Sequence, residues 1–312
     1  MNILITGGLG YVGSTLVSHL LKKSHHRIIV IDRMDYSLNR DWYFNTLYND
    51  RVKIVKGDFR SVDLLYPLIK ECDVVINLAA LVGEPICEKK PDEAIITNEV
   101  MVKIIGQMCN IESKKLIFLS TCSNYGQSST PVSETSTLLP VSLYAITKVN
   151  AEKYIRKHVH GAIILRCATA YGISPGRMRW DLLLNDFVKT AVFEKNMDVF
   201  GAQAYRPLCH VEDISEAIRL VIDYDTSDKT TVFNVGSSEQ NYTKKEIANT
   251  IAKITGVKIT FTDTEEKRNY MVDFSKIKKT LKFVPIHTLK DGIKTMSSAL
   301  KKKEIDVIGS NV

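Results

Sequence analysis

Short apolar runs alternate along the first half of the chain with longer stretches of helical periodicity. The runs cover residues 3–5, 28–31, 52–55, 74–77, 116–120 and 162–165. Strands that are apolar on both faces are buried on both sides, and strands separated by helices pair in parallel. The pattern therefore predicts an α/β fold with a doubly wound parallel sheet that helices cover on both faces.

The pattern becomes less regular in the second half of the chain. Turn-forming residues occupy 172–176, and a helical pattern over 182–194 follows. Residues 231–235 have the composition of a strand that returns to the sheet. Two further amphipathic helices are predicted near 244–255 and 289–300.

We expect two closely packed lobes, because neither an internal repeat nor a low-complexity linker separates them. The sheet with its helices is expected to comprise residues 1–171 and 207–235 and to bind a dinucleotide. A smaller, mixed α/β lobe is expected to comprise residues 172–206 and 236–312 and to bind the substrate.

The chain of 312 residues is 45% hydrophobic and 25% charged, which is typical of a globular protein. No apolar run approaches the roughly 18 residues that span a bilayer, and the first residues lack the features of a signal peptide. We therefore expect no membrane partner and a cytoplasmic location. Lysines near the C-terminus supply much of the net charge of +7, and a solvated surface explains them better than nucleic-acid binding. The six cysteines show neither a disulfide framework nor the spacing of a zinc or other metal site.

A glycine-rich loop, T-G-G-x-G-x-x-G, follows the first predicted strand and precedes a predicted helix. Glycine lets the backbone turn sharply and lets a pyrophosphate approach the helix N-terminus, where N–H groups and the helix dipole favour anions. Such a loop within a βαβ unit predicts a dinucleotide-binding site. The cofactor contacts are expected at Gly7, Gly10, Tyr11 and Val12.

Asp32 ends the second predicted strand, about twenty residues after the glycines, where a carboxylate accepts hydrogen bonds from the adenosine ribose. A carboxylate there repels a 2′-phosphate, so NAD is favoured over NADP. Arg33 either softens this preference by pairing with a phosphate or is a surface arginine. Asp58 either binds the adenine amino group or forms an ordinary Asx turn.

Tyr144 and Lys148 lie one turn apart in a segment of helical periodicity, so their side chains share a face. A nearby ammonium stabilises a phenolate, and at about 4 Å with an effective dielectric near 20 the attraction is on the order of 4 kcal/mol, or roughly three pKa units. We therefore expect Lys148 to lower the pKa of Tyr144, which would make Tyr144 a general base. Thr121 ends the fifth predicted strand and either binds the substrate oxygen or bonds its own turn.

The order T-G-G-x-G-x-x-G, Asp32, N-L-A-A at 77–80, S-T-x-x-x-Y-G and Y-x-x-x-K resembles the extended short-chain dehydrogenases/reductases, the nucleotide-sugar epimerase/dehydratase family typified by UDP-galactose 4-epimerase. The resemblance covers essentially the whole chain. It implies NAD as the cofactor and catalysis at C4 of a nucleotide-linked sugar by Thr121, Tyr144 and Lys148. Further cofactor contacts that it implies are Phe59, Leu78, Ala79, Ala80 and Asn98.

Two further features bear on the substrate. Asn98 is also compatible with a helix N-cap. The residues after Thr121 are Cys122 and Ser123, where dehydratases of the family carry Asp-Glu, so loss of water is disfavoured. Cys122 is explained better by packing than by acid catalysis, and Ser123 is expected to contact the substrate together with Val82.

The segment G-I-S-P-G-R-M-R-W-D at 172–181 resembles a branch of the family found in bacterial surface-polysaccharide pathways, which includes a GDP-heptose 4-dehydrogenase. Arginine binds phosphate oxygens in pairs through its planar fork. The family positions that line the nucleotide diphosphate match Arg179, Arg206 and Arg268, and Asn185 is a further expected substrate contact.

The leading hypothesis is a nucleotide-sugar 4-epimerase, in which Tyr144 removes the C4 hydroxyl proton and NAD accepts and returns a hydride. A net 4-dehydrogenase or 4-ketoreductase uses the same three residues and stays open. A non-catalytic dinucleotide-sensing protein is the alternative of another class, although such relatives usually lose the tyrosine or the lysine. The resemblance also implies a homodimer through the helices at 98–110 and 144–157.

Overall fold

A seven-stranded sheet forms the centre of the computed structural model, which describes residues 1–36, 38–266 and 268–305. The strand order is β10-β6-β5-β4-β1-β2-β3, and each neighbouring pair is parallel. The order reverses between β1 and β4, and ligands of such sheets bind beside this switch point at the carboxyl ends of the strands. The strands are β1 (Asn2–Thr6), β2 (Arg27–Asp32), β3 (Val52–Lys56), β4 (Val74–Asn77), β5 (Lys115–Thr121), β6 (Ile163–Cys167) and β10 (Thr231–Val235).

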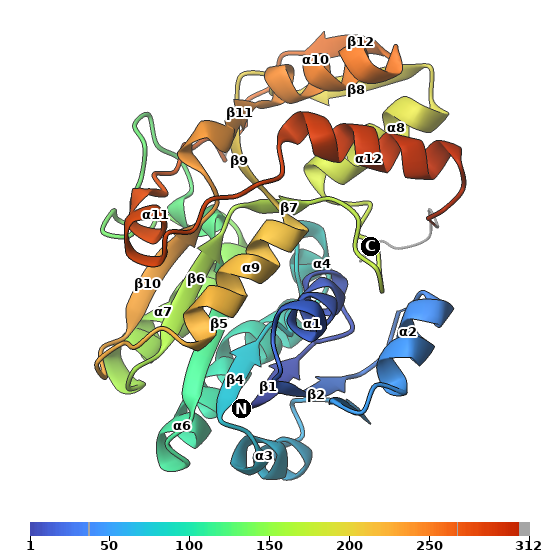
Figure 1. Cartoon of the computed structure of the whole chain (residues 1–312). Helices are drawn as coiled ribbons and strands as arrows, with labels where there is room; N and C mark the ends of the chain where they lie inside the picture. Colours follow the sequence, from blue (N-terminus) through green and yellow to red (C-terminus); the bar gives the residue numbers. More distant parts are fainter. Residues whose placement is uncertain (37, 267, 306–312) are drawn as a thin grey trace.

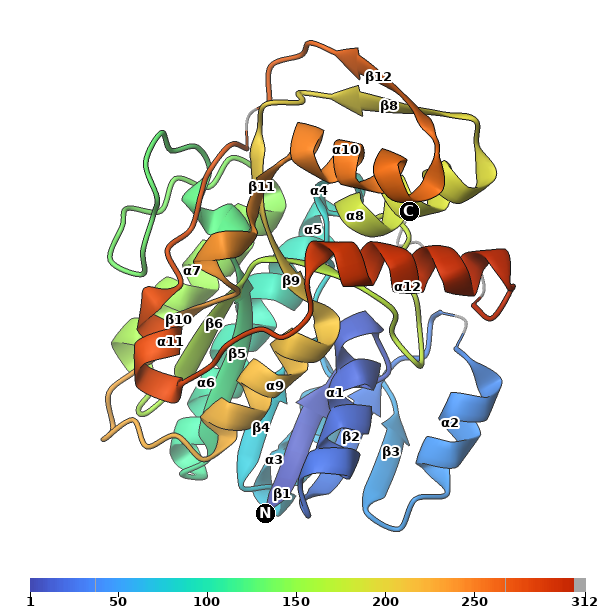
Figure 2. The same cartoon turned by 45° about the horizontal axis from the view of Figure 1, so that its top comes forward.

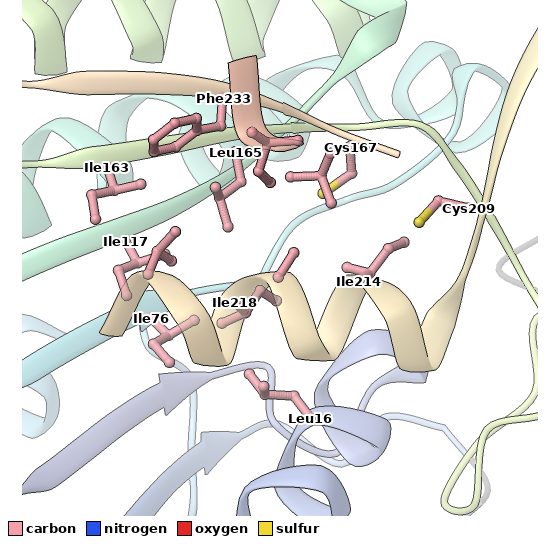
Figure 3. Close-up of a cluster of buried hydrophobic side chains, with 14 of the residues drawn as sticks. Leu16, Ile76, Ile117, Ile163, Leu165, Cys167, Cys209, Ile214, Ile218 and Phe233 are labelled. Atoms are coloured by element: carbon pink, nitrogen blue, oxygen red, sulfur yellow. The ribbon is translucent and has the colours of Figure 1, made fainter. Parts of the chain in front are cut away.

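Helices cover both faces of the sheet, as the apolar runs predict. Ile3 and Ile5 of β1 belong to one buried cluster and Leu4 to another, because successive side chains of a strand point to opposite faces. The first face packs against α1, α9 and α11, and Figure 3 shows Ile76 and Ile117 of the sheet beside Ile218 of α9. The second face packs against α3, α6 and α7. These helices are α1 (Tyr11–Lys23), α3 (Val62–Glu71), α6 (Met101–Ile111), α7 (Leu143–His158), α9 (Val211–Ile222) and α11 (Ser275–Leu281).

A smaller group of elements lies beyond the carboxyl ends of the central strands (Figures 1 and 2). It contains a three-stranded sheet, β11-β9-β7, and a two-stranded parallel sheet, β12-β8. Helices α8, α10 and α12 pack on one another around a third apolar cluster, which includes Leu184, Ile247 and Met296. The elements are β7 (Thr169–Tyr171), α8 (Leu183–Phe193), β8 (Asn196–Phe200), β9 (Tyr205–His210), β11 (Asn241–Thr243), α10 (Lys244–Thr255), β12 (Lys258–Thr262) and α12 (Leu289–Lys301).

The predicted fold class is confirmed, and so is the parallel return strand, β10. The five short strands of the two smaller sheets were not predicted, because they mix polar and apolar residues and are at most six residues long. The remaining elements are short helical segments. They are α2 (Arg40–Leu47), α4 (Glu84–Lys89), α5 (Pro91–Ile95), the π-helix η1 (Ile96–Val100), and the 3₁₀-helices η2 (Cys122–Tyr125) and η3 (Ser238–Gln240). A search of the described residues finds no helix whose length and apolarity would let it span a membrane.

Candidate active site

A cavity of about 840 Å³ opens at the carboxyl ends of β1, β2, β4, β5 and β6, and residues of the smaller lobe line its other side. Most of the residues that the sequence assigns to cofactor and substrate line it. They are Gly7, Gly10, Tyr11, Val12, Asp32, Arg33, Phe59, Leu78, Ala79, Ala80, Val82, Thr121, Ser123, Tyr144, Lys148, Arg179, Arg206 and Arg268. The cavity therefore joins both halves of the predicted site.

The glycine loop has a shape that larger residues cannot adopt. Gly7 has a φ of +70°, and a Cβ atom there would lie 2.9 Å from the Ala79 Cα atom. A Cβ atom on Gly13 would lie 2.3 Å from the carbonyl oxygen of Gly7. Gly10 is the N-cap of α1 and has no side chain that could cap the helix, so the first N–H groups are available to an anion. This cradle fits the pyrophosphate of a dinucleotide.

The carboxylate of Asp32 is held beside this loop. It accepts hydrogen bonds from the N–H groups of Leu9, at 3.1 Å, and Met34, at 2.9 Å. Arg33 pairs with carboxylates instead of facing a phosphate, because its guanidinium lies 2.6 Å from Asp35 and 3.0 Å from Glu93. This arrangement favours the ribose hydroxyls of NAD over the 2′-phosphate of NADP.

Thr121, Tyr144 and Lys148 come together from β5 and α7. Helix α7 begins after Ser142, whose hydroxyl accepts a hydrogen bond from the Ala145 N–H group. The Thr121 hydroxyl, at the end of β5, accepts the Ser123 N–H at 3.1 Å and lies near the Tyr144 phenol, whose pKa it acts to lower. Lys148 is 2% exposed and donates to the Leu119 carbonyl oxygen at 2.9 Å, and burial lowers its pKa to about 8.

The expected effect of Lys148 on Tyr144 is wrong for this structure. Burial raises the pKa of Tyr144 above its usual value of 10.0, whereas Arg179 and Thr121 act in the lowering direction. The physical reason is that the Lys148 ammonium turns toward the Leu119 carbonyl and lies 4.6 Å from the centre of the Phe118 ring. The spacing of four residues predicted the shared helix face but not this orientation.

A buried ion pair links the elements that carry the catalytic side chains. Arg166 of β6 and Glu152 of α7 meet at 2.6 Å, and both side chains are 1% exposed. The Glu152 carboxylate also accepts hydrogen bonds from Ser120 and from Asn124, at 2.7 Å. One carboxylate thus ties together β5, η2, β6 and α7, the elements that carry or adjoin Thr121, Tyr144 and Lys148. Cys122 donates its thiol to the Arg166 carbonyl at 3.2 Å, which agrees with a packing role.

Of the arginines on the substrate side, Arg206 and Arg268 are in contact, whereas Arg179 has other partners. Arg179 binds both carboxylate oxygens of Asp181, at 2.7 and 2.5 Å, and donates to the Val82 carbonyl at 3.3 Å. Arg179 also influences the pKa of Tyr144, so it lies near the reacting groups. Arg206 pairs with Glu266 at 2.9 Å and donates to the Arg268 carbonyl. The diphosphate contact expected for Arg179 stays a prediction.

Three predicted contacts are not among the described residues that line the cavity, namely Asp58, Asn98 and Asn185. The Asp58 carboxylate accepts the N–H of Arg60 at 2.9 Å, which is the Asx-turn alternative. Asn98 holds the backbone of Leu81 through two hydrogen bonds of 2.9 Å from within η1, so the N-cap alternative is also wrong.

Like Asn98, Asn185 binds the protein backbone behind the cavity wall. It is fully buried, accepts the N–H of Gly172 at 3.1 Å, and donates to the Tyr11 hydroxyl at 3.2 Å and to the Arg179 carbonyl at 2.9 Å. Spacing in the sequence cannot distinguish a side chain in a cavity wall from one directly behind it.

Several cavity residues were missed by the sequence analysis. They are Tyr36, Glu84, Cys167, Arg177, Asp181 and Lys244. Arg177 and Asp181 had a usable signal, because three charged residues lie within five positions of a turn-rich segment. Cys167 and Lys244 had none, because their approach to the cavity depends on how the lobes pack.

His210, Glu212 and His287 also converge, although they are far apart in the sequence, and their ligand atoms lie within 4.8 Å of one another. The two imidazole rings are stacked with centroids 4.1 Å apart and an interplanar angle of 18°. Metals bind histidine in the plane of the ring, and the planes of these rings run side by side. The His210 Nδ1 atom also accepts the Glu212 N–H at 3.2 Å, so the cluster is a packing contact in this conformation.

Comparisons with known proteins agree with this geometry. The family model described as "NAD dependent epimerase/dehydratase family" matches residues 3–236. The chain is 31% identical to an uncharacterized UDP-glucose epimerase, YtcB, of Bacillus subtilis, over 94% of this chain and 96% of that protein. It is 25% identical to the low-salt glycan biosynthesis protein Agl12 of Haloferax volcanii, over 94% and 96%. The UDP-glucuronic acid 4-epimerase of Bacillus cereus, solved with UDP-glucuronic acid and NAD, superposes with a TM-score of 0.86 at 25% identity, over 97% of this chain and 100% of that one.

Proposed function

Because the chain belongs to the NAD dependent epimerase/dehydratase family, we propose that it is an NAD-dependent enzyme that acts at C4 of a nucleotide-diphosphate sugar as a 4-epimerase. The observation that carries this proposal is that Thr121, Tyr144 and Lys148 line the same cavity as the glycine loop. The relatives named above as epimerases of UDP-glucose and UDP-glucuronic acid support the reaction type.

The side chains have separate tasks in this reaction. NAD, when bound, supplies the hydride acceptor and donor, and its positively charged ring favours a neighbouring phenolate. Tyr144 takes the proton of the sugar hydroxyl and returns it, while Thr121 holds the sugar oxygen. Lys148 keeps a positive charge beside them at neutral pH, because its pKa of about 8 lies above 7. Glu152 and Asn98 act as positioning residues behind the cavity wall.

The rest of the cavity divides between the cofactor and the nucleotide sugar. The cofactor half comprises Gly7, Gly10, Tyr11, Val12, Asp32, Phe59 and the backbone at 78–80. We assign the diphosphate of the substrate to Arg206 and Arg268, which line the part formed by the smaller lobe. Arg179, Val82 and Ser123 lie nearer to the sugar. The division expected at residues 171, 206 and 235 stays a prediction, and α11 packs on the central sheet although its residues fall in the segment expected for the smaller lobe.

The test uses catalytic amounts of NAD with UDP-, GDP- and dTDP-linked hexoses. An epimer should appear in the NMR spectrum without net NADH absorbance at 340 nm. Stoichiometric NADH or a ketosugar would replace the epimerase by a net 4-dehydrogenase, and oxidation of added NADH by a 4-ketosugar would indicate a 4-ketoreductase. Tyr144→Phe should lose nearly all turnover while binding NAD normally, and full turnover by this variant would refute the assigned base.

We also propose a homodimer built on α5, η1 and α7. These segments carry exposed apolar residues: Ile95, Ile96 and Val100 in α5 and η1, and Ile146 in α7. A contiguous apolar surface favours association. Ile96→Glu should shift the mass measured by light scattering from a dimer to a monomer. A monomeric native protein would contradict the proposal.

A role in surface-glycan synthesis, in the cytoplasm, is the finer part of the proposal. The similarity to Agl12, a low-salt glycan biosynthesis protein, supports it. Deletion of the gene should remove or alter one sugar of the surface glycan. An unchanged glycan composition would show that the enzyme does not act in surface-glycan synthesis.

A further inference from the structure

Part of the smaller lobe reaches across the cavity and packs on helix α1. We call residues 173–177 the strap. Ser174 contacts the first turn of α1 through three buried hydrogen bonds: its hydroxyl lies 2.7 Å from the Ser14 hydroxyl, donates to the Tyr11 carbonyl at 2.8 Å, and accepts from Thr15 at 3.1 Å. The strap is therefore fixed to the helix whose N-terminus belongs to the glycine loop.

Gly176 brings the strap close to the segment after β2. Its carbonyl oxygen accepts the Asn39 N–H at 2.8 Å. A Cβ atom on Gly176 would lie 2.6 Å from the Ser14 Cβ atom and 2.6 Å from the Trp42 ring. The strap thus fills the space between α1 and α2, at the side of the cavity where Asp32 ends β2.

Arg177 follows directly and lines the cavity together with Asp32 and Tyr36. Its guanidinium carbon lies 3.5 Å from the centre of the Tyr36 ring, which holds the group in place. Arg177 is only 8% exposed, and burial and Arg179 lower its pKa while Asp32 acts in the raising direction. An arginine remains a cation at neutral pH even so, so a buried positive charge lies next to the carboxylate expected to hold the adenosine ribose.

We propose that the strap closes over the adenosine diphosphate portion of NAD and that Arg177 contacts this portion. The proposal rests on the NAD-dependent function proposed above. A guanidinium matches the oxygens of a diphosphate, and Arg177 and the glycine loop approach the cofactor half of the cavity from opposite lobes. The cofactor leaves only after the strap separates from α1.

The experiment measures NAD binding without any sugar. The protein is stripped of cofactor, and its dissociation constant for NAD is determined by isothermal titration calorimetry. Arg177→Met should bind NAD about 10- to 100-fold more weakly, the range of one charge-assisted hydrogen bond, and Arg177→Lys should recover part of the loss. Gly176→Ala should accelerate NAD release by displacing the strap from Ser14 and Trp42. Arg27→Met, at the opposite end of β2, is the matched control and should bind NAD as the native protein does.

Gel filtration of the protein loaded with NAD gives a second readout of the Arg177 contact. NAD should co-elute with the native protein and with Arg27→Met, and it should separate from Arg177→Met. With saturating NAD, Arg177→Met should keep the native KM for the nucleotide sugar. Equal NAD affinity of Arg177→Met and the native protein would overturn the proposal, as would a rise in the sugar KM alone. These outcomes do not depend on the reaction type. A native protein that binds NAD tightly but forms no epimer would contradict the proposed function and leave the role of Arg177 intact.

Discussion

Replacing Glu152 by glutamine is expected to destabilise the protein strongly, although the residue lies outside the cavity. Glutamine keeps the shape of the side chain but removes its charge, so the Arg166 guanidinium would stay buried without its ion-pair partner, 2.6 Å away in the native protein. Removing one partner of a buried pair costs about 3–5 kcal/mol. The entropy of unfolding is about 2.1 cal/mol/K per residue, or roughly 0.65 kcal/mol/K for 312 residues, so this loss corresponds to a decrease of roughly 5–8 °C in Tm.

The assay is urea and thermal unfolding of Glu152→Gln, Arg166→Met and the double variant. A coupling energy of at least about 2 kcal/mol is expected, because the double variant no longer buries an unpaired charge. Glu216→Gln is the matched control, since Glu216 pairs with Arg219 at a half-exposed site and should cost at most about 1 kcal/mol. Equal losses for Glu152→Gln and Glu216→Gln, or strictly additive single losses, would refute the reasoning.

The same substitution should change the pH dependence of catalysis. The Glu152 carboxylate acts to raise the pKa of Lys148, which burial lowers to about 8. Without this carboxylate the Lys148 ammonium loses its proton at a lower pH. The alkaline limb of the kcat profile, expected near pH 8 in the native enzyme, should therefore move to lower pH in Glu152→Gln. An unshifted limb would show that Lys148 does not control it.

Three further predictions concern single residues of the cavity. Lys148→Met should abolish turnover but raise the free energy of unfolding at pH 7 by about 1–3 kcal/mol, because the folded pKa of Lys148, about 8, lies below the usual 10.5. The cost of burying the ammonium is complete below pH 8 and fades as the pH rises toward 10.5. An equal gain in stability at pH 7 and pH 10 would contradict this prediction. Gly7→Ala should lose NAD binding in calorimetry, because its Cβ atom would meet Ala79 and its φ is positive, and native affinity would refute the cradle. Asp32→Ser should lower the ratio of kcat/KM with NAD to kcat/KM with NADP at least about tenfold. An unchanged ratio would show that another residue sets the cofactor preference.

The sheet could be predicted well because its strands are buried on both faces. Ile28–Ile31 and Val74–Asn77 are continuous apolar runs, and the structure extends each by at most a residue or two. The strands β8 and β12 could not be predicted in this way, because β8 alternates exposed and buried residues over only five positions. Their pairing depends on contacts between residues about sixty positions apart, which no local pattern contains.

The site was predictable where chemistry and spacing act together, as for the glycine loop and for Tyr144 with Lys148. It was not predictable where the direction of a side chain decides the outcome. Asn98 and Asn185 match positions near the ligands, yet their amides bind backbone groups of the loops that form the cavity wall. Arg177 is the reverse case, since its place beside Tyr36 exists only after the smaller lobe has folded onto α1.

The position of β10 in the sheet has a consequence for the order in which the protein can be completed during synthesis. The glycine loop is translated first, but β6, which pairs with the edge of β5, and β10, which pairs with β6, are not available until residues 167 and 235 have left the ribosome. Until then a nascent chain carries an unpaired apolar edge strand, which invites misassociation. Fragments that end near residue 160 should therefore aggregate. The dinucleotide-binding half should be completed only when the segment around residue 235, three-quarters of the way along the chain, has been translated.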